Sequence, residues 1–149
     1  MNIKLFLALL GIFSFISCTS TKNTIQNIDY KATRPKIIAN KYVLTDYAPN
    51  DKYGYDKNFP INIGVASLSS ENYFIKLFFN AITDIEGNAV MYEKIDTCCP
   101  FPSANSKVGA GLLHRYKVTF KDGTSKELFF NIYEKGAIMC PTGFKIAQS

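Results

Sequence analysis

Apolar residues recur at helical spacing in the middle of the chain. Six of them fall at positions i, i+3, i+4, i+7, i+8 and i+11: Phe74, Leu77, Phe78, Ala81, Ile82 and Ile85. This spacing predicts one face of an amphipathic helix, and Ile75 and Phe79 widen that face enough for packing on two sides. The pair Ser69-Ser70 offers N-cap candidates, with Glu71 in the first turn, where the helix dipole favours an anion. The helix is expected to end at Glu86-Gly87-Asn88.

Strict alternation of period two predicts a β-hairpin in the last third of the chain. Leu112, His114, Tyr116, Val118 and Phe120 share one face of the first strand, and Leu128, Phe130 and Ile132 share one face of the return strand. A two-residue turn at Asp122-Gly123 would mix the two faces. A three-residue loop, Lys121-Asp122-Gly123 with Gly123 in the left-handed conformation, keeps them matched. The predicted pairs are then Tyr116 with Leu128, His114 with Phe130, and Lys117 with Glu127, the last an ion pair.

Shorter segments complete the predicted fold. Residues 42–45, 61–65 and 90–95 are expected to be strands, and residues 48–60 and 103–111 are rich in turn-forming residues. The element order β–β–α–β–β–β predicts an α+β domain over residues 41–149. We expect a small, mostly antiparallel sheet with one packed helix and the C-terminal β-hairpin, the second face of the sheet being partly exposed to water.

The N-terminus has the features of an export signal. Lys4 precedes an apolar stretch that ends at Ile16 and is too short to span a bilayer, so residues 1–17 are interpreted as a lipoprotein signal peptide. Ser17-Cys18 resembles the bacterial lipobox, which predicts acylation of Cys18; an ordinary secretory signal with an incidental Cys18 is the alternative. Residues 18–40 are polar and are expected to form the lipidated Cys and a tether. Thr19 favours the outer membrane, with the domain facing the periplasm.

Composition and charge exclude several classes. The 149 residues are too few for an eight-stranded β/α barrel, and 47% hydrophobic with 14% aromatic residues is inconsistent with wholesale disorder. The net charge of +5 is spread over turns and element ends, so no nucleic-acid surface is predicted. The sequence has neither a P-loop nor a Gly-x-Ser-x-Gly motif, and we predict no cofactor and no catalytic residue.

Three cysteines remain beside Cys18, and they cannot all pair with one another. A disulfide from Cys98 or Cys99 to Cys140 is the favoured arrangement, because an exported protein folds where disulfides persist. A vicinal Cys98–Cys99 bond is the alternative. A zinc site with His114 has little support, since no Cys-x-x-Cys pair is present, and we predict no metal.

Two further features could carry function. His114 is the single histidine and occupies an inward hairpin position, which favours a hydrogen-bonded core residue over a catalytic base. Tyr47, Tyr53, Tyr55 and Phe59 crowd a turn-rich loop and are candidate binding residues, because exposed Tyr is a common contact residue. A loop held in place by its own aromatic side chains is the favoured alternative.

Several segments together resemble an uncharacterised family of small lipoproteins from Bacteroidetes-type bacteria. They are Lys52-Tyr53-Gly54-Tyr55, Phe79-Asn80 with Asp84, Gly87 and Asn88, Cys98-Cys99-Pro100-Phe101, Gly111-Leu112-Leu113 with Tyr116, and Pro141 with Gly143-Phe144. Members often carry the label 2-dehydro-3-deoxyphosphooctonate aldolase. Physical arguments oppose that activity here, because the enzyme so named is a cytosolic β/α barrel that binds phosphorylated substrates, whereas this chain is short and has no phosphate-cradling loop.

The leading hypothesis is therefore a non-enzymatic envelope protein anchored in the membrane by its acyl chains. Its domain would bind an envelope protein or another envelope component. The alternatives are an exported enzyme or thiol-redox protein that uses the Cys98-Cys99 region, and a purely structural lipoprotein.

Overall fold

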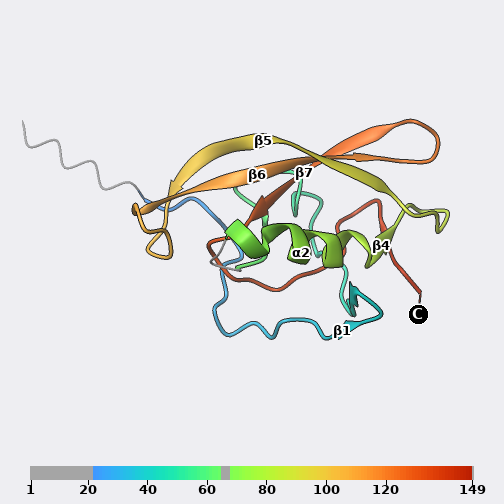
Figure 1. The fold of residues 1–149 in the computed structure, drawn as a ribbon, viewed down its shortest axis with the longest axis horizontal. Coiled ribbons are helices and arrows are strands. Elements are labelled where there is room, and N and C mark those ends of the chain that lie inside the picture. Colours follow the sequence, from blue (N-terminus) through green and yellow to red (C-terminus); the bar gives the residue numbers. More distant parts are fainter. Residues whose placement is uncertain (1–21, 65–67, 149) are drawn as a thin grey trace, which may run out of the picture.

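The fold is built around a four-stranded sheet and one helix (Figure 1). The computed structural model describes residues 22–64 and 68–148. The strand order in the sheet is β3 (Ile61–Asn62), β7 (Ser125–Asn131), β6 (Ala110–Thr119) and β5 (Met91–Pro102). Only the short β3–β7 pair is parallel. Helix α2 (Leu68–Phe79) covers one face, which confirms the predicted α+β class with a mostly antiparallel sheet.

Helix α2 is packed on two sides, as its wide apolar face predicts. On the sheet side, the Phe78 ring lies 5.2 Å from the Phe130 ring, and the Phe79 ring stacks on Tyr92 at 4.0 Å between centroids. On the other side α2 contacts β2 (Lys41–Tyr42), where the Tyr42 side chain is buried. Phe78, Phe79, Phe130 and Tyr42 all belong to the main hydrophobic core.

The helix is shorter at its C-terminal end than its apolar pattern predicts. It ends at Phe79, and the last three apolar positions of the predicted face lie beyond it: Ala81 is buried, Ile82 belongs to β4 (Ile82–Thr83), and Ile85 is exposed. Strand β4 pairs with β8 (Lys145–Ile146). Residues 82–83 therefore form a strand with the C-terminal segment and do not continue the helix. Helix α2 also begins at Leu68, which places Ser69-Ser70 inside its first turn and not at the N-cap.

The hairpin register is the one predicted. Tyr116 pairs with Leu128, His114 with Phe130, and Lys117 with Glu127. The loop has three residues, and Gly123 has a φ of +84°, as the bulged turn requires. The predicted ion pair is wrong in its cation: the Glu127 carboxylate accepts from Arg115 Nη1 at 3.2 Å, and Arg115 also binds Asp96.

Strand β5 is much longer than the predicted segment 90–95. It continues through Cys98-Cys99 to Pro102, and the only loop before β6 is residues 103–109. Register shifts occur between Lys94 and Asp96 and between Cys98 and Phe101, so β5 is a bulged edge strand. Such bulges let the strand continue past the prolines, whose missing N–H groups cannot join a regular ladder.

The expectation that residues up to 40 form a tether is wrong for the described residues from 22 onward. Ile25 is 8% exposed and packs with Phe101 and Leu113 in a second hydrophobic cluster on the other face of the sheet. The side-chain amide of Asn62 donates to the backbone oxygens of Gln26 and Asn27. Further along, β1 (Ile37–Ile38) pairs with β2. Residues 1–21, including Cys18, lie outside the described residues.

Candidate functional site

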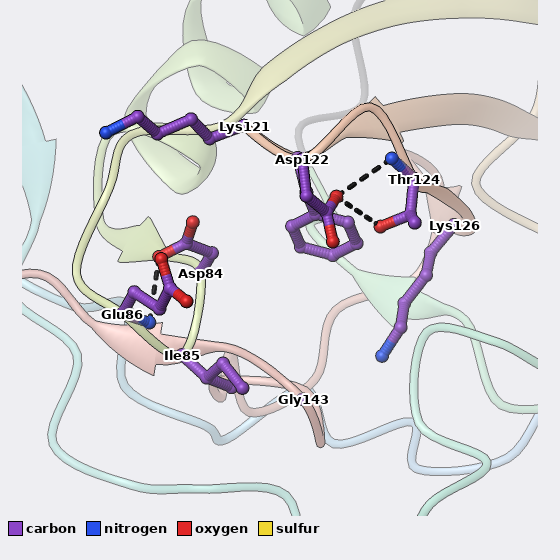
Figure 2. Close-up of a pocket in the computed structure, with 9 residues that line it drawn as sticks. Asp84, Ile85, Glu86, Lys121, Asp122, Thr124, Lys126 and Gly143 are labelled. Carbon is purple, nitrogen blue, oxygen red and sulfur yellow. Dashed lines mark hydrogen bonds between the residues drawn. The ribbon is translucent and has the colours of Figure 1, made fainter.

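A cavity of about 430 Å³ lies where three loops meet at one end of the molecule. The loops are the turn after β4, the β6–β7 turn and the segment before β8. The charged lining residues are three carboxylates and two lysines: Asp84, Glu86, Asp122, Lys121 and Lys126. Ile85, Phe120, Thr124 and Gly143 complete the lining (Figure 2). An open cavity of this size that combines apolar and charged groups is typical of a small-molecule site.

Local hydrogen bonds hold the carboxylate of Asp84 in place. Its Oδ1 accepts from the backbone N–H groups of Glu86 and Asn88 at 2.9 and 2.7 Å, and its Oδ2 accepts from the Asn88 amide at 3.0 Å. Desolvation alone would raise the pKa of Asp84, but the hydrogen bonds from Asn88 lower it overall. Asp84 is therefore a fixed negative charge that closes the turn after β4.

Asp122 is held in a similar way at the tip of the hairpin. Its Oδ1 accepts from the backbone N–H of Thr124 at 2.8 Å and from the Thr124 hydroxyl at 2.6 Å. These two bonds lower the pKa of Asp122. Figure 2 shows the Asp122 side chain on the cavity wall, with both bonds running to Thr124.

Lys126 supplies a positive charge that is held by aromatic rings. Its ammonium lies 5.4 Å from the ring centroid of Tyr55 and 5.8 Å from those of Phe120 and Phe144. The attraction between a cation and a ring face keeps the ammonium against this three-ring group. Gly143 lies beside it with a φ of +85°, a conformation that favours glycine, and a Cβ at that position would push the Lys126 ammonium aside.

The opposite charges around the cavity do not pair with one another. Every ion pair in the described part of the chain involves Lys94, His114 or Arg115, none of which lines the cavity. Lys121 donates to Asn88 Oδ1 at 3.3 Å, and its ammonium points away from the cavity in Figure 2. The cavity therefore presents charges of both signs: Lys126 and Asp122 come from the β6–β7 hairpin, and Asp84 and Glu86 come from the turn after β4.

A second polar cluster is buried between α2 and the sheet. Oε1 of Glu71 accepts from His114 Nδ1 at 2.5 Å, from Lys94 Nζ at 2.9 Å and from the Tyr116 hydroxyl at 2.9 Å. Glu71, His114 and Tyr116 are each less than 5% exposed. We call these four residues the Glu71 cluster. It joins the first turn of α2 to β5 and β6, and His114 is the hydrogen-bonded core residue that its hairpin position predicts.

The charge state of the Glu71 cluster follows from its contacts. Burial alone would raise the pKa of Glu71, but hydrogen bonds from His114, Lys94 and Tyr116 lower it below its usual value. Burial lowers the pKa of His114, and the nearby Lys94 ammonium adds to this effect against the opposing contact with Glu71. The cluster thus contains a carboxylate anion, an ammonium and a neutral imidazole.

The four aromatic residues predicted to bind a partner do not form one exposed surface. Tyr53 is 1% exposed, and its hydroxyl bonds to backbone groups of Ala137 and Met139, so it is not available for contact. Tyr55 and Phe59 are half-buried. Only Tyr47 is largely exposed, at 55%. A loop held in place by its own aromatic side chains is the better description, although the Tyr55 ring contributes to the group around Lys126.

The predicted bridge to Cys140 is wrong. The structure bonds the sulfurs of Cys98 and Cys99 to each other, and their Cα atoms are 3.7 Å apart, less than in most disulfides. Cys140 is a buried free thiol in the main core, where burial raises its pKa to about 12. Cys140 cannot reach Cys98 or Cys99, because those two residues pack against the second cluster, on the other face of the sheet. In the described residues, no group of His, Cys, Asp and Glu is arranged to hold a metal ion.

No local sequence pattern identifies the cavity. Its residues come from three separate parts of the chain, and the turn residues among them are common in any loop. The available signal was the set of resembling segments: Tyr55, Asp84 with Asn88, and Gly143-Phe144 all converge at this end of the molecule.

Comparisons with known proteins find no relative of this chain. No family model, no curated protein and no solved structure matches the chain. Among the described residues, no helix has the length and apolar character needed to cross a membrane.

Proposed function

We propose that this chain is a lipid-anchored protein of the bacterial envelope whose domain binds a small ligand in the cavity at the hairpin end. One observation carries the binding proposal: the cavity contains opposite charges that are each held by local partners and not by one another. Charged groups that face an open cavity and form no ion pair with one another can interact with a bound molecule.

The position of the N-terminal segment fits this arrangement. In Figure 1 the described chain begins at the end of the molecule near the β5–β6 loop, and the β6–β7 turn lies at the opposite end. Because Ile25 is already packed, the chain from Cys18 to Ile25 can span only about 25 Å. An anchor at Cys18 would hold the domain close to the membrane, with the cavity at the far end.

The anchor is tested by replacing Cys18. In bacteria that process lipoproteins, the full chain is expected in the membrane fraction with an acylated N-terminus, because several acyl chains together give stable anchoring. Cys18→Ala should lose both the acyl mass and the membrane association. Ser20→Ala is the matched control and should behave as the original chain. An unacylated Cys18 in membrane-extracted protein would contradict the proposal.

Binding is tested by analysing what leaves the protein on denaturation. The full chain is purified in detergent, denatured, and its released small molecules are measured by mass spectrometry. We expect a compound in excess from the original chain and at least a tenfold smaller amount from Lys126→Met. Lys117→Met, on the outer face of the sheet, should retain it. If the two variants release equal amounts of every compound, the cavity is not the binding site.

A further inference from the structure

We propose that the cavity recognises a zwitterion, a small molecule with a free ammonium and a free carboxylate, such as an amino acid or a short peptide with unblocked ends. This inference rests on the proposed binding function and specifies the class of ligand. It follows from the placement of the charges, from the groups that hold each one, and from the apolar surface between them.

Lys126 is the group that would bind the ligand carboxylate. Figure 2 shows its side chain extending into the cavity, and the three rings behind it contact its ammonium without taking its hydrogen bonds. No carboxylate of the described residues lies within ion-pair distance of it. The ammonium is therefore a positioned cation that can still donate to an anionic ligand group.

Asp122 is the group that would bind the ligand ammonium. The backbone N–H and the hydroxyl of Thr124 both donate to Oδ1 of Asp122, and no described residue donates to Oδ2. Asp84 differs, because Glu86 and Asn88 use both of its oxygens. Asp84 supplies negative potential, while Asp122 retains a free acceptor atom on the cavity wall.

The mixture of charges disfavours ligands that carry only one sign. A simple anion attracted to Lys126 would also meet Asp84, Glu86 and Asp122, and a simple cation would meet Lys126. A zwitterion matches both signs of charge, so the site discriminates by repulsion as well as attraction. Ile85 and Phe120 offer apolar surface for the ligand's small side chains, and 430 Å³ accommodates a dipeptide.

The test measures the binding of L-alanyl-L-alanine to the full chain in detergent by isothermal titration calorimetry. Its N-acetyl, C-amide and doubly blocked forms are the matched probes. We expect each single block to weaken binding at least tenfold. Lys126→Met should weaken binding of the dipeptide about tenfold and remove the preference for the free acid over the amide. Asp122→Asn should instead remove the preference for the free amine over the N-acetyl form.

Controls keep the outcomes separable. Lys117→Met should bind all four probes as the original chain does, and the thermal unfolding midpoint of each variant checks its folding. Equal affinity for the free and doubly blocked dipeptides, or no binding of the free dipeptide at millimolar concentration, would overturn the zwitterion proposal. A neutral or singly charged compound released on denaturation would also overturn it, while leaving the proposed binding function standing.

Discussion

Replacing Glu71 with alanine is expected to lower the free energy of unfolding by about 4 kcal/mol, because it leaves buried partners without their acceptor. Glu71 Oε1 is the common acceptor for Lys94, His114 and Tyr116. Removing it leaves a partly buried ammonium with no carboxylate and a buried hydroxyl with no acceptor from this side chain. The loss should also free the first turn of α2 from β5 and β6.

Urea denaturation of the full chain in detergent, followed by circular dichroism, measures this change. Glu127→Ala is the matched control, because it also removes a glutamate from an ion pair, but one whose side chain is 51% exposed. It should cost less than about 1 kcal/mol. A loss at Glu71 no greater than the loss at Glu127 would show that the Glu71 cluster does not stabilise the fold.

The free energy of unfolding of the original chain is also expected to depend on pH. Folding lowers the pKa of Glu71 from 4.5 and that of His114 from 6.5, so the unfolded chain binds more protons as the pH falls. Stability should therefore decline progressively below about pH 6.5, first through His114 and then through Glu71. The stability that the Glu71 carboxylate itself contributes should be present above pH 4.5 and be lost as the pH falls through its lowered pKa in the folded state.

Replacing Gly136 with alanine is expected to cost about 2 kcal/mol, because a side chain at this position overlaps a well-packed neighbour. A Cβ on residue 136 would overlap the backbone oxygen of Asn27 and lie 3.0 Å from Cβ of Asn62. The N-terminal segment would have to move away. It would then lose the hydrogen bonds from Asn62 and the burial of Ile25.

Unfolding in urea gives the magnitude, and limited trypsin digestion shows where the change occurs. Cleavage after Lys31 should become faster in Gly136→Ala than in the original chain, because its segment is released. Ala137→Ser changes the next, exposed residue and should leave both readouts unchanged. If Gly136→Ala unfolds at the same urea concentration and is cleaved at the same rate, residues 22–36 do not depend on this contact.

Local patterns were sufficient to predict the hairpin. Its register follows from three facts that lie within twenty residues: the alternation of the two strands, the preference of Gly123 for positive φ, and the mismatch that a two-residue turn would cause. The inward position of His114 follows from the same register. The apolar face of α2 was equally predictable, because burial on two sides requires a broad stripe at helical spacing.

The remaining features depend on partners that are distant in sequence. Ile82 has helical spacing, yet its strand partner is Ile146, so pairing with the C-terminus ends the helical pattern early. The polar N-terminal segment has no periodicity, but its backbone bonds to Asn62, and a single apolar residue, Ile25, secures it. Cys140 cannot reach Cys98 or Cys99, because it is buried in the other cluster.

The sequence by itself determined the α+β class, the hairpin register and the core face of the helix, because each follows from spacing along one element. Only the tertiary structure decided the candidate site. Lys126 became a positioned cation because Tyr55, Phe120 and Phe144 meet around it, and the turn after β4 brings Asp84 and Glu86 to the same cavity. No local pattern encodes that meeting, since it arises from the packing of loops separated by up to ninety residues.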